Sequence, residues 1–135
     1  MLVEKARKYY DKKYDLNCAE TIIYAANEEY SLGLSKETLK ALAGFGGGLC
    51  VEHICGAITG AIAVIGIMYT DEKSHQSPIV KELTQKFMNN FKDKLQEYNC
   101  DKLKEKYKKD EEFRCLYMVE SSAEILQDLI DEQNK

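Results

Sequence analysis

The chain of 135 residues contains no tryptophan and a single proline, Pro78. Proline removes a backbone donor and clashes inside a helix, so its scarcity leaves long stretches free to be helical. The sequence also lacks the alternation of apolar and polar residues with a period of two that indicates a β-strand. Residues that favour helices dominate instead. The sequence therefore predicts an all-α fold.

A basic surface is also missing. Lys and Arg number 19 against 23 Asp and Glu, for a formal net charge of -4, which excludes the basic face typical of nucleic-acid binding. The charged first 15 residues lack the apolar core of a secretory signal. The longest uncharged run, residues 54–70, is shorter than the ~20 residues that span a bilayer. We therefore expect a cytoplasmic protein that does not span a membrane, with this run as a buried central helix.

Several familiar site motifs are absent. There is no CxxC pair, which excludes a thioredoxin-like motif and a zinc-ribbon knuckle, and no CxxCH for c-type haem. The cysteine spacings of ferredoxins are missing as well. The glycine-rich segment 44–48 is not followed by GK[ST] or preceded by a strand, so it is not a P-loop. Any cysteine site must therefore collect its thiols from separate helices.

Helical periodicity and capping residues predict one domain over residues 1–135, a bundle of about five to seven helices around the apolar one. Asn17 and Ser35 are typical N-caps, and Pro78 suits a first helical position. Gly56 and Gly60 place small residues on one face, where a neighbouring helix can approach closely. The expected helices span approximately 2–13, 18–30, 36–43, 52–70, 78–98 and 101–107, and a last one starts near 111–113.

Four of the five cysteines lie near predicted helix starts: Cys18, Cys55, Cys100 and Cys115. Unpaired N–H groups and the helix dipole favour a thiolate at such positions. We predict that the four thiols meet at one end of the bundle as the catalytic residues. They would either cycle through disulfides or, as metal ligands, hold an iron–sulfur cluster or another thiolate-bound metal such as zinc. The alternative is that each is a small core residue.

The segment between two of these cysteines supplies further candidates. Gly46, Gly47 and Gly48 can bring bare backbone N–H groups close to the sulfurs or to a bound cofactor, although a plain tight turn explains them as well. His53, two residues before Cys55, could pair with its thiolate or serve as a ligand. Cys50 could fold back toward the same site. We predict these five residues as cofactor-binding.

Together, these features resemble a known family. The sequence Asn17-Cys18-Ala19-Glu20, the glycine-rich segment, the CGAITG sequence at residues 55–60 and the later Cys100 and Cys115 resemble the C_GCAxxG_C_C family of redox-active proteins with a CGAxxG motif. The resemblance covers nearly the whole chain and implies a redox role for the four cysteines, with Cys50 outside the set. Because members are often encoded near transporter genes, it also implies a membrane transporter or a redox protein as partner.

Three functions remain open at this point. The first is a small redox-active protein that uses four cysteines at helix starts. The second is a metal-binding or metal-handling module associated with a transporter, and the third is a structural adaptor whose cysteines only pack. The sequence leaves undecided whether the chain is an enzyme, what its substrate is and whether its Gly/Ala helix face forms a homodimer.

Overall fold

The computed structural model describes residues 1–108, 110 and 113–135 of the chain. Over these residues the fold is all-α, as predicted, and the only β-type pairing is an isolated bridge between Ile54 and Asn99. Short helical turns occur at Lys12–Tyr14, Gly48–Glu52 and Ser74–Gln76. The α-helices of the described part are α1 (Leu2–Tyr10), α2 (Cys18–Glu29), α3 (Lys36–Lys40), α4 (Gly56–Tyr69), α5 (Pro78–Leu95), α6 (Cys100–Tyr107) and α7 (Leu116–Gln133).

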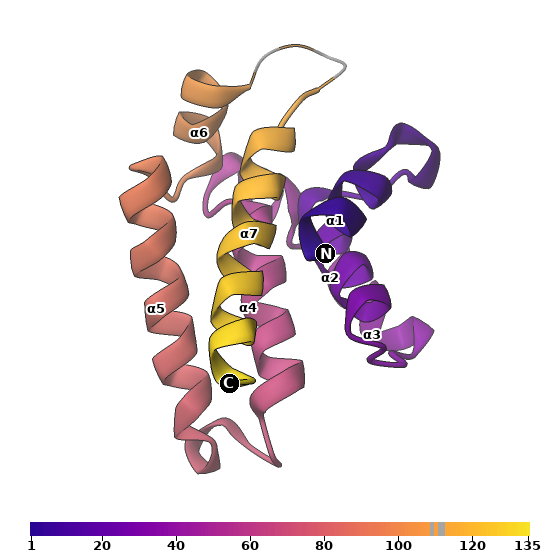
Figure 1. Cartoon of the computed structure of the whole chain (residues 1–135). Helices are drawn as coiled ribbons and strands as arrows, with labels where there is room; N and C mark the ends of the chain where they lie inside the picture. Colours follow the sequence, from indigo (N-terminus) through magenta and orange to yellow (C-terminus); the bar gives the residue numbers. More distant parts are fainter. Residues whose placement is uncertain (109, 111–112) are drawn as a thin grey trace.

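Helix α4 is the centre of the bundle, as its uniformly apolar sequence predicts. It packs against α2, α5 and α7, and α1 covers α2 and α7. Figure 1 shows α5 on one side of the α4–α7 pair and helices α1 to α3 on the other. Residues on one broad face of α4, including Ala57, Ile58, Ala61 and Val64, are fully buried.

The apolar stripes of the long helices complete the core. On α5, Phe87 and Phe91 are fully buried and their rings stack with centroids 6.1 Å apart. On α7, Ser122 turns its hydroxyl inward and donates to the Ala57 carbonyl at 2.7 Å. This bond satisfies a buried polar group and fixes α7 against the first turn of α4.

The predicted capping residues begin their helices as expected. The Asn17 side chain accepts from the Glu20 N–H at 2.7 Å, while the Glu20 carboxylate accepts from the Asn17 N–H at 3.0 Å. This reciprocal pair is a capping box. Ser35 accepts from the Thr38 N–H at 3.1 Å, and Pro78 occupies the first position of α5.

Several predicted boundaries are wrong. The first helix ends at Tyr10 because Asp11 leaves the helical conformation and caps a separate short turn. Helix α4 begins at Gly56 rather than near residue 52, because φ is positive at Glu52 and at three residues of the turn before it, Gly48, Leu49 and Cys50. Helix α5 ends at Leu95 and the left-handed Gln96, before residue 98. Helix α7 begins at Leu116, and Glu111 of its predicted start lies outside the described residues.

No helix among the described residues is both long enough and apolar enough to cross a membrane. The uncharged run after residue 54 instead forms α4, which is covered by neighbouring helices.

Candidate thiol site

All four predicted cysteines lie at helix starts. Cys18 is the first residue of α2 and Cys100 the first residue of α6, while Cys55 and Cys115 are the N-cap residues of α4 and α7. Figure 1 shows the beginnings of α4, α6 and α7 at the same end of the bundle. This part of the prediction is confirmed.

Glycines on α4 allow Cys18 to lie beside Cys55. A Cβ atom at Gly56 would lie 3.2 Å from the Cβ of Cys18, and one at Gly60 would lie 2.7 Å from the carbonyl oxygen of Ala19. Because neither glycine has a side chain, the first two turns of α2 rest directly on those of α4. The small residues of the CGAITG sequence thus bring the first two cysteines together.

Backbone pairing places Cys100 next to the same point. The Cys55 N–H donates to the Tyr98 carbonyl at 2.9 Å, and the Cys100 N–H donates to the His53 carbonyl. These bonds flank the isolated bridge of Ile54. A Cβ at Gly48 would lie 2.7 Å from the Cβ of Cys100, so the left-handed glycine turn closes tightly over this cysteine.

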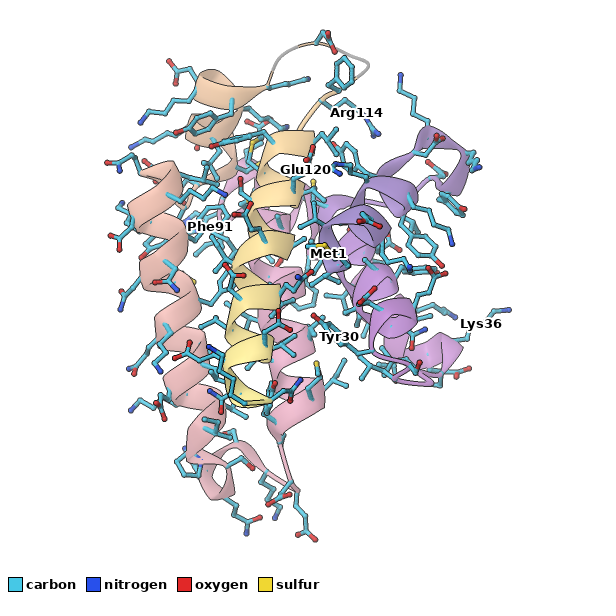
Figure 2. The ribbon with its side chains drawn as sticks, in the orientation of Figure 1. Met1, Tyr30, Lys36, Phe91, Arg114 and Glu120 are labelled. Atoms are coloured by element: carbon cyan, nitrogen blue, oxygen red, sulfur yellow. The ribbon has the colours of Figure 1, made fainter. Side chains whose placement is uncertain are left out.

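Tyr10 of α1 fixes the position of Cys115. Its hydroxyl accepts from the Cys115 N–H at 2.9 Å, satisfying a free donor at the start of α7. The neighbouring Arg114 donates through Nη2 to the Tyr10 carbonyl at 2.8 Å and lies 4.2 Å from the centre of the Tyr10 ring. Figure 2 shows Arg114 just before α7, at the end of the bundle where α4, α6 and α7 begin.

Cys18 and Cys115 are free thiols that line the same cavity and affect each other's pKa. The Cys18 thiol donates to the sulfur of Cys115, and this bond, burial and the three other nearby thiols raise the pKa of Cys18 well above its usual value. The same bond lowers the pKa of Cys115 to about 7, and the positive charges of Lys104, Lys108 and Arg114 also favour its thiolate. At pH 7 a large share of the molecules, about half, therefore carries a thiolate on Cys115 beside the protonated thiol of Cys18.

The thiols of Cys55 and Cys100, which complete a cluster with Cys18 and Cys115, stay protonated. Burial raises the pKa of Cys55 to about 12, although the N–H groups of Ala57 and Ile58 act in the opposite direction. Burial likewise raises the pKa of Cys100. The prediction that a helix start favours a thiolate at each cysteine is therefore wrong for Cys18, Cys55 and Cys100. Desolvation disfavours the charged form there more than the helix start favours it.

The predicted cofactor-binding residues occupy different places. Gly46 packs on the Asn17 side chain and Gly48 on Cys100, whereas Gly47 lines a cavity beside Cys18 and Cys115. His53 is exposed and contacts the cluster through its backbone carbonyl. Cys50 is exposed and left-handed, with its Sγ 3.8 Å from the Gly44 carbonyl oxygen. Cofactor binding by these residues stays a prediction.

The cavity beside Cys18 and Cys115 contains residues that sequence reasoning missed. Its volume is about 210 Å³, and its lining includes Tyr10 and three cationic side chains. Leu16, Asn17 and Arg114 stand next to or near a cysteine in the sequence, whereas Tyr10, Lys104 and Lys108 reach the site through tertiary packing. The lining residues are Tyr10, Leu16, Asn17, Cys18, Gly47, Lys104, Lys108, Arg114 and Cys115.

The ligands of a metal site are not brought together in this conformation. Over residues 1–108, 110 and 113–135, no group of three or more His, Cys, Asp or Glu side chains is placed to hold a metal ion. The ligand role of Cys18, Cys55, Cys100 and Cys115 stays a prediction.

Fold and site together define a small all-α protein with a cluster of free thiols at its helix starts. The chain belongs to the family described as "Putative redox-active protein (C_GCAxxG_C_C)", whose model matches residues 16–129. The resemblance inferred from the cysteine pattern is thereby confirmed. No curated protein and no solved structure matches the chain.

Proposed function

We propose that this protein is a thiol–disulfide redox protein in which Cys115 is the attacking thiolate and Cys18 the resolving thiol. The observation that carries the proposal is that these two free thiols line the same cavity beside three cationic side chains, and the pKa is raised on Cys18 and lowered on Cys115. A thiol with a pKa near ambient pH combines a useful thiolate fraction with good nucleophilicity.

The reaction follows from these roles. The Cys115 thiolate attacks one sulfur of a disulfide substrate, and the first substrate thiolate leaves as a mixed disulfide forms on Cys115. Cys18 then loses its proton and attacks the Cys115 sulfur, which releases the second substrate thiolate. The protein has given up two electrons and the Cys18 proton and holds a Cys18–Cys115 disulfide, and one further proton comes from solvent. The substrate has become two thiols.

Cys55 and Cys100 have a different place in this proposal. Both are buried, and burial keeps their thiols protonated at neutral pH. They are therefore poor first nucleophiles. That they exchange electrons with the first pair, as catalytic residues of the same reaction, stays a prediction.

The metal site, the partner and the homodimer predicted from the sequence are supported to different degrees. The second candidate, thiolate ligation of an iron–sulfur cluster or another metal, has the proximity of four thiols in its favour but not the arrangement of ligands described above. A transporter or redox partner stays an expectation from the family resemblance. A homodimer loses its sequence argument, because the Gly56 and Gly60 face is covered by α2 within the chain.

The decisive experiment is oxidation of the reduced protein, purified without oxygen, followed by disulfide mapping. We expect diamide to produce a Cys18–Cys115 disulfide first, and excess dithiothreitol to restore both thiols. Cys115→Ser and Cys18→Ser each abolish this product. Cys50→Ser is the matched control, because Cys50 is exposed and points to the Gly44 carbonyl.

Two results would contradict the proposal. One is a first disulfide that joins another pair of cysteines, or none at all. The other is a protein that leaves anaerobic purification with stoichiometric iron and sulfide, bound through the same thiols, and the visible spectrum of a cluster. In that case the metal-binding candidate replaces the redox couple.

A further inference from the structure

We infer that the cavity beside Cys18 and Cys115 recognises a small disulfide that carries a carboxylate or another anionic group, held by Lys104, Lys108 and Arg114. The inference rests on the proposed function and adds to it the chemical class of the substrate. It follows from the composition, charge and size of the cavity wall.

The cavity wall is positively charged on a chain that is acidic overall. The formal net charge is -4, yet the described residues that line the cavity include three cations and no carboxylate. Lys104 has an acidic neighbour, since its Nζ lies 3.4 Å from a carboxylate oxygen of the exposed Glu52. Such a partly exposed pair is weak, worth less than about 1 kcal/mol, and leaves Lys104 able to bind a second anion.

Arg114 provides a fixed donor at the edge of the reacting pair. Its guanidinium is held by the Tyr10 carbonyl and ring, at 2.8 Å and 4.2 Å respectively. Its Nε is buried and has no hydrogen-bond partner among the described residues. A buried donor without an acceptor is unfavourable, and an anionic ligand beside it relieves that cost.

Size and depth favour a small molecule over a protein substrate. Cys115 is only 9% exposed, so its sulfur lies too deep for a disulfide held in a folded partner. The cavity volume of about 210 Å³ is below the ~300 Å³ at which pockets usually enclose a whole ligand. The cavity therefore takes one anionic arm and the adjacent sulfur, while the second half of the disulfide remains in solvent.

The test compares three small disulfides that differ mainly in charge. These are dithiodipropionate, a dianion; hydroxyethyl disulfide, which is neutral; and cystamine, a dication. The rate of each with the reduced protein is divided by its rate with free mercaptoethanol, which removes differences in intrinsic reactivity. We expect the normalised rates to fall from the dianion to the dication, and added salt to narrow the difference because it screens the charges.

Matched variants locate the effect. Lys104→Gln and Lys108→Gln should each slow the dianion by about two- to fivefold more than the neutral disulfide, because both disulfides lose rate when less of Cys115 is a thiolate but only the dianion also loses a binding partner. Lys106→Gln is the control. Lys106 lies on α6 with Lys104 but outside the cavity lining, so the variant makes the same change in net charge and should leave both rates unchanged. Arg114→Lys keeps the positive charge but loses the several N–H donors of the planar guanidinium. It should therefore weaken the preference for the dianion over the neutral disulfide without abolishing it.

A second measurement does not depend on redox chemistry. Suberate is the carbon analogue of dithiodipropionate, and octanediamine is its cationic counterpart. We expect suberate, and not octanediamine, to shift the amide NMR signals of Gly47 and Arg114.

The outcomes separate the inference from the proposed function. If the Cys18–Cys115 disulfide forms but the three normalised rates are equal and suberate shifts nothing, this inference is wrong and the redox function stands. If only an acidic protein disulfide reacts and the small dianion does not, the inference is wrong in its substrate class. If no disulfide forms with any probe, the proposed function fails and this inference falls with it.

Discussion

Each clustered cysteine has a similar local position but a distinct chemical character. Cys55 and Cys115 are both N-cap residues, yet burial raises the pKa of the first to about 12 and a donated hydrogen bond lowers that of the second to about 7. The difference comes from the surroundings of each sulfur. A neighbouring thiol and three cations surround Cys115, whereas apolar packing surrounds Cys55.

The Cys55 pKa leads to a prediction on stability. Its pKa in the folded protein is raised to about 12 from an ordinary value of 9.0. Below that ordinary value the thiol is neutral in both the folded and unfolded states, so the stabilisation is complete. As pH rises from there through the folded pKa, only the unfolded state ionises and the stabilisation is lost. We expect a loss of about 1 kcal/mol in the free energy of unfolding between pH 9 and pH 10 from this residue.

Urea unfolding of the reduced protein at several pH values measures this loss. In Cys55→Ala the free energy of unfolding should fall by about 1 kcal/mol less between pH 9 and pH 10, because the variant lacks the titrating thiol. The buried Tyr10 and half-buried Tyr30, whose pKa values are also raised, contribute to the decline in both proteins, so the difference between the two slopes isolates Cys55. Cys50→Ala is the control and should leave the slope unchanged. An identical slope in wild type and Cys55→Ala would show that the Cys55 pKa is not raised.

Among the helices, α4 shows how glycine can have opposite effects within one element. Gly60 faces α2, and a Cβ there would lie 2.7 Å from the Ala19 carbonyl oxygen and 2.9 Å from its Cα. Gly66, later in the same helix, has no atom within 4 Å of the corresponding position. Both glycines lower the helix propensity of α4, but only Gly60 is required by packing.

Alanine at these two positions should therefore act in opposite directions. Gly66→Ala is expected to stabilise the protein by about 0.5–1 kcal/mol through helix propensity. Gly60→Ala gains the same propensity, but the contact with backbone atoms forces α2 and α4 apart and costs about 1–3 kcal/mol. The free energy of unfolding in urea measures both.

The same pair of variants also tests the thiol site. Because Gly60 lies one turn from the position where α4 contacts Cys18, separation of the two helices should also slow disulfide formation in Gly60→Ala. Gly66→Ala should leave that rate unchanged. Destabilisation by Gly66→Ala, or a stabilised Gly60→Ala, would contradict this account of the helix interface.

For the molecule as a whole, the candidate pair joins distant parts of the chain. Cys18 begins α2 and Cys115 caps α7, so a disulfide between them encloses α2 to α6 in one loop. The contacts that prepare this closure come from both ends of the chain. Tyr10 of α1 binds the start of α7, and Arg7 pairs with Glu120 at 2.8 Å.

Oxidation should therefore stabilise the whole fold. A disulfide that closes a long loop constrains the unfolded chain, and we expect the oxidised protein to unfold with a free energy about 2–4 kcal/mol higher than the reduced protein. Urea unfolding of both forms, with loop closure verified by mass spectrometry, measures the difference. Cys115→Ser should show no such change on oxidation. Equal midpoints for the two wild-type forms would indicate that closure strains the native helices.

The sequence by itself determined the all-α fold, the central apolar helix and the place of four cysteines at helix starts, because caps, helical periodicity and small-residue spacing are local properties of the chain. It also placed Gly56 and Gly60 at a close helix contact. Only the tertiary structure decided which thiol is acidic, which two are paired and which cations face them. Segments that are distant in sequence bury the thiols, bring Cys18 and Cys115 together and place Tyr10, Lys104 and Lys108 beside them. No local pattern encodes the charge or solvent exposure that such packing creates.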